Sequence, residues 1–246
     1  MSGKNKLICD YNITDWLWAF WNTNMINLPT GPDLGALPIG YQFWFIRDLM
    51  VVMLFSPIVY FLVKKLRQYA VLGLGVLWLF GWWFEVVGFS ITALFFFSAG
   101  AYFSIHGKNF AEVMKPFLPA IAILYFPMVI VELCFRNEIW CTYLHSIGIL
   151  FGILLAITLS AYFLKKGKWH VNYFLSDSSF FIYAYHAMPL IFVIKFFLKS
   201  VQSYTDGMIL VLYVLCPLVT ILVGLAFYYL LKKYLPTFTS IITGSR

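Results

Sequence analysis

The sequence predicts an all-α fold, a polytopic transmembrane helical bundle of about seven spans, from three observations. First, 62% of the 246 residues are hydrophobic and only 11% are charged, whereas a soluble domain carries about 25% charged residues. So few charges cannot cover a water-facing surface, and lipid is the surrounding that tolerates them. Second, the apolar residues form long uninterrupted runs. Third, the runs lack the alternation over about ten positions that is typical of membrane β-strands.

Seven apolar stretches define the expected spans, since a helix needs about 20 apolar residues to cross the hydrocarbon core. In chain order they are residues 43–63, 69–84, 86–105, 117–135, 141–164, 180–198 and 208–231. The second and third stretches are nearly continuous, and we place a hairpin where Gly81, Glu85 and Gly88 interrupt them.

Residues 1–42 form a leading segment ahead of the transmembrane domain of residues 43–246. The segment contains Trp16, Trp18 and Trp21, and tryptophan is enriched where a membrane meets water. We therefore expect an extracytoplasmic, interfacial segment. It has no signal-peptide pattern, because acidic residues break its apolar stretch.

The seventeen basic residues are divided unevenly between alternate loops. Eleven fall in the connections that begin at Lys64, His106, Lys165 and Lys232, five fall on the alternate side, and Lys195 lies within a span. The positive-inside rule then predicts a cytoplasmic C-terminus and an exported N-terminus. The net charge of +7 is interpreted as this topology signal and not as a nucleic-acid surface, since no nucleic-acid motif is present.

Export of the leading segment without a signal peptide needs an explanation. We expect that an odd number of helices precedes Met1 in a truncated or split reading frame. The alternative is a genuine protein with an outside N-terminus, in which the first span acts as a reverse anchor.

Ionisable side chains in spans are candidate functional residues, because each costs about 2.5–3.5 kcal/mol at the span centre. Arg47 and Asp48 in the first span point about 100° apart on a helix, so we expect them to pair with other helices. Six such residues fall toward the same outer face: Arg47, Asp48, Glu85, Glu132, His145 and Lys195. They predict an outward-facing polar cavity, and the alternative is that the side chains extend from helix ends to water.

His186 lies about two turns into the sixth span, close to Pro189. The proline leaves the Tyr185 carbonyl without its helical donor. A histidine in that place is either a proton carrier or a buried structural residue.

A basic run follows the fifth span on the expected cytoplasmic side and comprises Lys165, Lys166, Lys168 and His170. It could attract the phosphates of a nucleotide-bearing donor, or it could serve only as a topology anchor. No metal is expected, because the four cysteines, Cys9, Cys134, Cys141 and Cys216, lack metal-ligand spacing.

Four stretches resemble motifs of the acyltransferase 3 family of membrane acyltransferases. Residues 43–49, FWFIRDL, running on to Ser56-Pro57, are similar to a WF-[IL]-RDL helix that ends in a Ser-Pro step. Residues 95–102, FFFSAGAY, are similar to the FF-x-x-G-x-Y helix, and residues 178–186, SSFFIYAYH, to the S-F-x-I-Y-x-x-H helix. Residues 235–246 resemble a C-terminal LP…LTGGR. Together these stretches run from Phe43 to Arg246.

The resemblance implies an enzyme of about ten spans in the bacterial inner membrane. Such an enzyme takes an acyl group from acetyl-CoA or another acyl-CoA in the cytoplasm and passes it to a hydroxyl of a cell-surface saccharide. The family's proposed base is a histidine in its first span, eleven positions after an arginine. Here Ile58 and Ile147 occupy that place after Arg47 and Arg136. Three further spans, either encoded upstream or supplied by a separate chain, would restore ten, so we expect these residues alone to transfer acyl groups weakly or not at all.

The site residues follow from the positions that match the family. We assign His186 to hydrogen bonding near the acyl donor, and Arg47 with Asp48 to holding the outer cavity and the acceptor. Lys165, Lys166 and Lys168 are assigned to the donor phosphates.

Two other classes of protein fit part of the pattern. A transporter or glycan exporter would use the outward polar cavity, with Lys195 and Glu132 as ion-coupling groups; no internal repeat favours it. A seven-span receptor fits the expected sidedness, but the third span ends in Ile105-His106-Gly107-Lys108 in place of Asp-Arg-Tyr.

Overall fold

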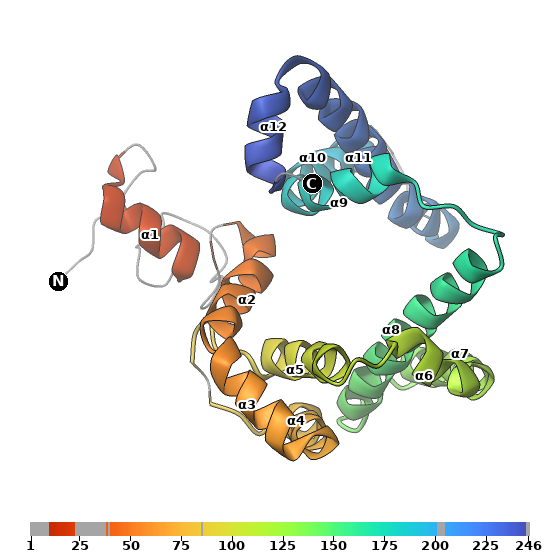
Figure 1. Cartoon of the computed structure of the whole chain (residues 1–246). Helices are drawn as coiled ribbons and strands as arrows, with labels where there is room; N and C mark the ends of the chain where they lie inside the picture. The colour runs from red at the N-terminus through yellow and green to blue at the C-terminus, as the bar shows by residue number, and fades with distance from the viewer. Residues whose placement is uncertain (1–9, 23–37, 39, 85, 201–204, 245–246) are drawn as a thin grey trace. The chain divides into compact units, whose positions relative to one another are not determined.

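The computed structural model describes residues 10–22, 38, 40–84, 86–200 and 205–244, and every regular element in these ranges is a helix (Figure 1). The chain divides into two compact units. The first unit comprises residues 1–39 and 44–170, and the second comprises residues 40–43 and 171–246. The expected all-α membrane class is confirmed.

The first unit contains eight α-helices and one 3-10 helix among its described residues. They are α1 (Ile13–Trp21), α2 (Trp44–Leu54), α3 (Ser56–Leu66), α4 (Gln68–Phe80), α5 (Ile91–Ile105), α6 (Phe110–Met114), η4 (Lys115–Phe117), α7 (Leu118–Cys134) and α8 (Cys141–Lys165). The described part of the second unit contains η3 (Tyr41–Phe43), α9 (Tyr173–Tyr185), α10 (Ala187–Ser200), α11 (Asp206–Tyr234) and α12 (Pro236–Thr243).

By length and composition, three helices in the described ranges could cross a membrane, and five spans result if each bent helix pair counts as one. The three are Phe110–Cys134, α8 and α11, and the bent pairs are Tyr41–Leu54 with α3, and α9 with Ala187–Lys199. The expected count of about seven is therefore not confirmed. The difference comes from α4 and α5, which have 13 and 15 residues and at 1.5 Å per residue are shorter than the roughly 30 Å hydrocarbon core.

Proline accounts for the bend in each pair. The axis turns by 67° between α2 and α3, where Pro57 follows the break, and by 71° between α9 and α10, where Pro189 follows it. A proline ring has no N–H and collides with the carbonyl four residues earlier, so it kinks a helix. The two bends coincide with two of the motif stretches described above.

The core of the first unit lies between α2, α3, α4 and α5. Its buried side chains are Val52, Val59, Val63, Ala70, Leu74, Leu94 and Phe95. Trp78 of α4 stacks on Phe95 of α5 with 5.3 Å between ring centroids, and its indole N–H donates to the Thr92 hydroxyl at 3.1 Å. A Cβ at Gly75 would lie 3.0 Å from the Phe95 ring, so the small residue allows the two helices to approach.

The expected hairpin between α4 and α5 is present. The chain leaves α4 through Gly81, whose φ of 66° lies in the left-handed region that glycine adopts without a Cβ penalty. The N–H groups of Gly81 and Trp82 donate to the carbonyls of Trp78 and Leu77, which is a Schellman helix end. Gly88 also has a positive φ, while Glu85 lies outside the described residues.

Helices α7 and α8 form the most extensive helix pair in the first unit. A Cβ at Gly152 of α8 would lie 3.3 Å from the Tyr125 ring of α7, and one at Gly148 would lie 3.6 Å from the Glu132 carboxylate. Small residues one turn apart allow two membrane helices to pack closely. This packing sets Glu132 beside the first turns of α8.

In the second unit, α9 packs against α11 over a glycine. A Cβ at Gly224 would lie only 2.7 Å from Ile182, so a larger residue would push the helices apart. The segment η3 is bound to α9 by two hydrogen bonds: Gln42 Nε2 donates to the Ala184 carbonyl at 3.0 Å, and Tyr183 Oη donates to the Gln42 carbonyl.

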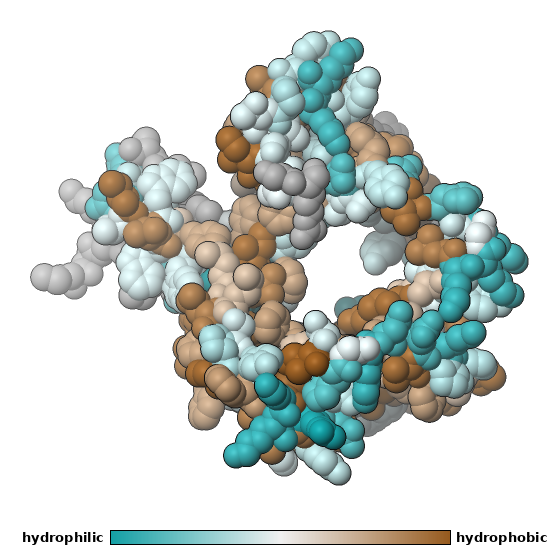
Figure 2. Space-filling view, viewed as in Figure 1, coloured by the Kyte–Doolittle hydropathy of each residue, from teal (hydrophilic) through white to brown (hydrophobic). Residues whose placement is uncertain are grey.

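Apolar side chains cover much of the surface of the helices (Figure 2). Leu133 on α7 is 72% exposed and Phe192 on α10 is 71% exposed. Helices that are apolar on all sides and little buried by protein need an apolar surrounding. The exposed apolar surface is therefore the lipid-facing surface of a membrane protein.

Candidate functional site

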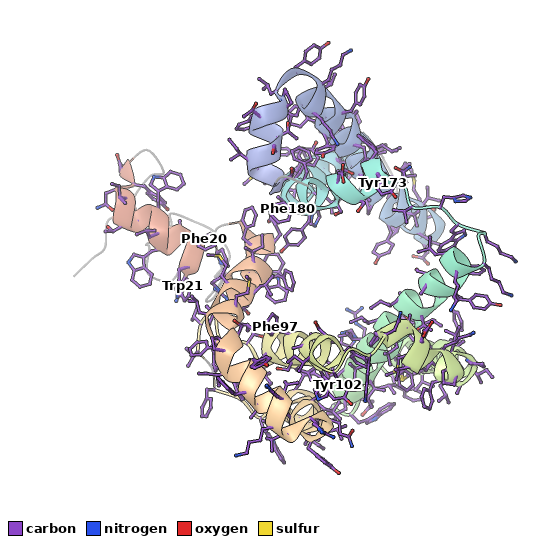
Figure 3. The ribbon with its side chains drawn as sticks, viewed as in Figure 1. Phe20, Trp21, Phe97, Tyr102, Tyr173 and Phe180 are labelled. Carbon is purple, nitrogen blue, oxygen red and sulfur yellow. The ribbon has the colours of Figure 1, made fainter. Side chains whose placement is uncertain are left out.

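Arg47 and Asp48 form a buried ion pair with each other on α2. Arg47 Nη2 lies 3.0 Å from Asp48 Oδ1, and the two residues are 5% and 3% exposed. A second guanidinium nitrogen donates to the carbonyl of Trp21, the last residue of α1, at 2.7 Å; Trp21 is labelled in Figure 3. The expectation that these neighbours would pair with other helices was wrong for the main contact, because the long arginine side chain can turn back to the adjacent carboxylate.

Two of the motif stretches meet around one cavity in the first unit. The cavity has a volume of about 630 Å³ and lies between α3 and α5. Its lining residues are Ser56, Pro57, Val59 and Tyr60 on α3, and Phe96, Phe97, Gly100, Ala101, Ser104 and Ile105 on α5. Phe97 can be found on α5 in Figure 3. The Ser-Pro step and the FFFSAGAY stretch therefore face each other.

The bend at Phe55 and the small residues of α5 create this space. A Cβ at Gly100 would have no heavy atom within 4 Å, so the glycine leaves room beside the apolar walls. Lys64 donates to the Tyr60 hydroxyl at 3.2 Å, which brings a positive charge to a residue of the cavity wall. The cavity is thus mostly apolar, with hydroxyl groups from Ser56, Tyr60 and Ser104 in its lining, as is typical of ligand pockets.

A second cavity in the first unit collects basic residues. Its volume is about 480 Å³, and its lining residues are Ala111, Glu112, Lys115, Thr158, Ala161, Tyr162, Lys165 and Lys166. Lys165 pairs with Glu112 at 3.0 Å, and the Lys166 ammonium lies 4.5 Å from the centre of the Tyr162 ring. The buried Thr158 hydroxyl has no hydrogen-bond partner in the described part of the chain, so a polar ligand group would satisfy it.

Lys168 is not among the residues that line this cavity. The chain turns away from α8 at Gly167, whose φ is 66°, and the Lys168 N–H donates to the Phe163 carbonyl at 3.1 Å. This is again a Schellman helix end. The structure thus brings together Lys165 and Lys166 of the three predicted phosphate-binding lysines and adds Lys115, which the sequence did not single out.

His186 lies at the bend between α9 and α10, in the second unit. Its Nδ1 lies 2.7 Å from the Tyr183 carbonyl and 3.2 Å from the Ile182 carbonyl. A carbonyl only accepts, so Nδ1 carries a proton and Nε2 of the neutral ring carries the lone pair. The bend therefore sets the histidine in one tautomer, with Nε2 as a hydrogen-bond acceptor or base.

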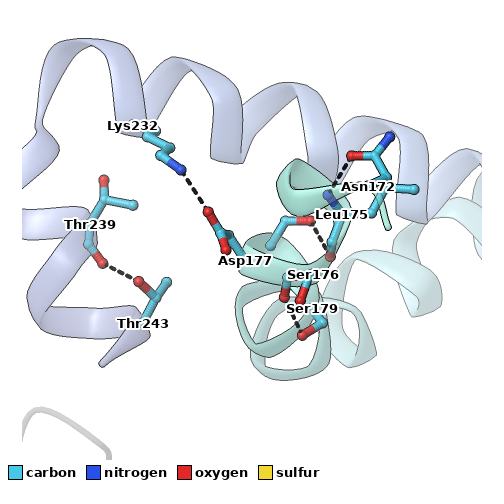
Figure 4. A network of polar contacts seen from close by, with 9 residues as sticks. Asn172, Leu175, Ser176, Asp177, Ser179, Lys232, Thr239 and Thr243 are labelled. Carbon is cyan, nitrogen blue, oxygen red and sulfur yellow. Dashed lines mark hydrogen bonds and ion pairs between the residues drawn. The ribbon is translucent and has the colours of Figure 1, made fainter. Parts of the chain in front are cut away.

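The sequence did not reveal one ion pair of the second unit, whose acidic member lies on α9, the helix that ends next to His186. Lys232 Nζ on α11 lies 3.0 Å from Asp177 Oδ2 on α9 (Figure 4). In the same unit, the buried Ser178 lies on α9, and the buried Thr239 and Thr243 lie on α12. Asp177 lies one position before the SSFFIYAYH stretch. Two signals could have revealed this ion pair: an acidic residue beside a family motif, and lysines at the end of the last long apolar run.

The other predicted ionisable residues are divided between the two units. Glu132 and His145 pair at 2.6 Å in the first unit, whereas Lys195 is an exposed residue of α10 in the second unit. Glu85 is not among the described residues. Cys134, Cys141 and Cys216 are free thiols.

Helices that could span a membrane are bent at a Ser-Pro step in the first unit and at a His-x-x-Pro step in the second, and the first unit holds an apolar cavity and a basic cavity. The sequence profile of an acyltransferase domain, that of the acyltransferase 3 family, matches residues 9–239. The chain belongs to this family. No curated protein and no solved structure matches the chain.

Proposed function

We propose that this membrane acyltransferase moves an acetyl or other acyl group from acyl-CoA to a hydroxyl of a cell-surface saccharide. We further propose that it acts in the bacterial inner membrane, with its N-terminus outside and its C-terminus in the cytoplasm. Family membership supports the acyltransferase class. The donor, acceptor and sidedness are the part that is proposed.

The meeting of two family motifs around the 630 Å³ cavity is the observation that carries the proposal. An acyl-CoA has a thin pantetheine arm that ends in the acyl thioester and a nucleotide head with several phosphate charges. The arm matches an apolar cavity with a few hydroxyl groups. Gly100 and Ala101 add no bulky side chain to the lining.

The phosphates of the donor match the basic cavity of the same unit. Lys115, Lys165 and Lys166 provide three ammonium groups against the single carboxylate of Glu112. Two unit charges 4 Å apart interact by about 4 kcal/mol at the effective dielectric constant of a protein surface. We propose that a donor phosphate replaces Glu112 as the partner of Lys165 and accepts a hydrogen bond from Thr158.

The reaction joins the acceptor oxygen to the acyl carbon. The hydroxyl oxygen attacks the thioester carbonyl, the carbon–sulfur bond breaks, and the hydroxyl proton passes to a base while the thiolate leaves. A positioned base contributes about 10²–10⁴-fold. His186, with its lone pair on Nε2, is proposed to bond near the donor, and Arg47 with Asp48 to hold the acceptor side of the site.

Binding of acetyl-CoA to the chain in lipid nanodiscs tests the donor. Gly100→Leu fills the cavity between α3 and α5 and should weaken binding by at least about tenfold, because the arm loses its space. Gly73→Leu is the matched control, since a Cβ at Gly73 on α4 also meets nothing within 4 Å but Gly73 does not line the cavity. Equal affinities for the two variants would contradict the proposal.

The charge requirement is tested on the same preparation. Lys165→Gln combined with Lys166→Gln should weaken acetyl-CoA binding by about ten- to a hundredfold at low ionic strength. Added salt should reduce the difference in affinity between wild type and this double variant. Lys199→Gln, also in the last turn of an apolar helix, is the control. Salt-independent binding would show that the lysines serve only as a topology anchor.

A further inference from the structure

The cleft between the end of α7 and the start of α8 carries a polar constellation that the donor site does not use. Its volume is about 370 Å³, and it is lined by Glu132, Leu133, Arg136, Cys141, Thr142 and His145. Glu132 Oε1 lies 2.6 Å from His145 Nδ1. Five of the six lining residues thus have side chains that can form hydrogen bonds, and the Cys141 thiol already donates to the Glu132 carbonyl at 3.6 Å.

The Glu132 carboxylate determines which nitrogen of the His145 ring is free to bond a ligand. A carboxylate accepts from Nδ1–H, so Nε2 of the neutral His145 ring carries the lone pair. Thr142 adds a hydroxyl that both donates and accepts, and Arg136 adds guanidinium donors. The lining residues therefore present donors and acceptors together, which matches a ligand whose hydroxyl groups both donate and accept.

Aromatic residues adjoin the lining residues of the cleft in the chain. Trp140, the residue before α8, is 45% exposed and lies 5.6 Å from the Phe135 ring, between centroids. Tyr143 on the first turn of α8 packs against Phe80 of α4 at 5.8 Å. A partly exposed indole can provide a flat apolar surface for the C–H face of a sugar ring.

The cleft lies at the opposite end of α8 from the basic cavity. Helix α8 has 25 residues, which span ~37 Å, more than the roughly 30 Å hydrocarbon core. The cleft at Cys141 and the cavity at Lys165 therefore face opposite sides of the membrane. If acyl-CoA binds at the cytoplasmic side, the cleft faces the compartment of the cell-surface glycan.

We infer that this cleft is a saccharide-binding subsite for the acceptor, in which Glu132, Thr142 and His145 bond sugar hydroxyls and Trp140 stacks on the ring. The inference rests on the proposed function for the acceptor's role. Binding of a sugar at the cleft can nevertheless be measured without any acyl donor.

The test is saturation-transfer NMR and titration of a β-linked glucose disaccharide against the full chain in sugar-free lipid nanodiscs. Wild type should bind with a Kd on the order of 1 mM, as is expected for a few hydrogen bonds and one stacked ring. Glu132→Ala and His145→Phe should each weaken binding by about tenfold, and Thr142→Val by about fivefold.

Ser146→Ala is the matched control, because Ser146 lies next to His145 and its hydroxyl donates to the Thr142 carbonyl at 3.2 Å, while the residue does not line the cleft. Its affinity should equal that of wild type. All variants should retain the thermal midpoint and acetyl-CoA affinity of wild type, which excludes unfolding as the cause.

The inference is overturned if wild type binds no disaccharide, or if Glu132→Ala and His145→Phe bind it as wild type does. Sugar binding at the cleft together with no binding of acetyl-CoA would overturn the proposed function and leave the subsite in place. Binding of acetyl-CoA together with no binding of the disaccharide would overturn the subsite and leave the proposed function in place.

Discussion

At the scale of single residues, charge is scarce in this chain and is paired where it is buried. Arg47 and Asp48 are nearly inaccessible, and the pair they form is completed by the Trp21 carbonyl. Taking two charges out of water is costly, and the cost is recovered only when each charge has a partner in good geometry. A change in one member of the pair should therefore matter more than the loss of both.

Asp48→Asn should lower the free energy of unfolding by about 3 kcal/mol, because it removes the carboxylate charge that faces the buried Arg47 guanidinium. The double variant Arg47→Met with Asp48→Leu should recover most of this loss. Thermal unfolding in detergent, followed by circular dichroism, measures both. If the single and double variants unfold at the same temperature, the ion pair does not stabilise the fold in this way.

At the scale of elements, a proline bend in each unit places candidate functional residues. The bend at Phe55 opens the cavity between α3 and α5, and the bend at His186 turns the imidazole onto the carbonyls of α9. In both cases the missing proline N–H prevents the helix from continuing as one rod. The short helix α5 supplies the wall of the cavity opposite α3.

Pro189→Ala restores the N–H that can donate to the Tyr185 carbonyl, so α9 and α10 should straighten. Spin labels at the exposed positions Tyr173 and Phe196 should then move apart by about 6 Å, on a rise of 1.5 Å per residue and loss of the 71° bend. Pulsed electron paramagnetic resonance measures this distance. An unchanged distance would show that packing against α11, and not the proline, holds the bend.

At the scale of the whole molecule, the apolar surface and the basic loops define how the chain lies in the membrane. Apolar side chains are exposed along α7, α8 and α11, and Lys64, Lys165 and Lys232 lie close to helix ends. Loops rich in lysine remain on the cytoplasmic side. The expected sidedness is therefore a property of the whole chain, summed over its loops.

Cysteine accessibility in intact cells tests this sidedness. In a background without the four native cysteines, Asp10→Cys should react with a membrane-impermeant maleimide, and Lys168→Cys should react only after the cells are lysed. The reverse pattern would place the basic cavity outside the cell. It would also remove acyl-CoA as its ligand, because that donor is cytoplasmic.

The sequence by itself determined the helical membrane class, the acyltransferase family and the positions of most candidate residues. The apolar runs and the scarcity of charge follow directly from the lipid that surrounds the chain. The family motifs are patterns of residue types, so they can be recognised in the sequence alone. The hairpin at Gly81 could also be predicted, because only a local backbone conformation was needed.

Only the tertiary structure decided which of these residues meet. It paired Arg47 with its own neighbour, joined the Ser56-Pro57 step to the FFFSAGAY stretch, moved Lys168 out of the basic cavity and joined Asp177 to Lys232. These outcomes depend on side-chain reach, on proline bends and on how closely glycines let helices approach. Hydropathy is averaged over a whole span, so it carries no information about such contacts.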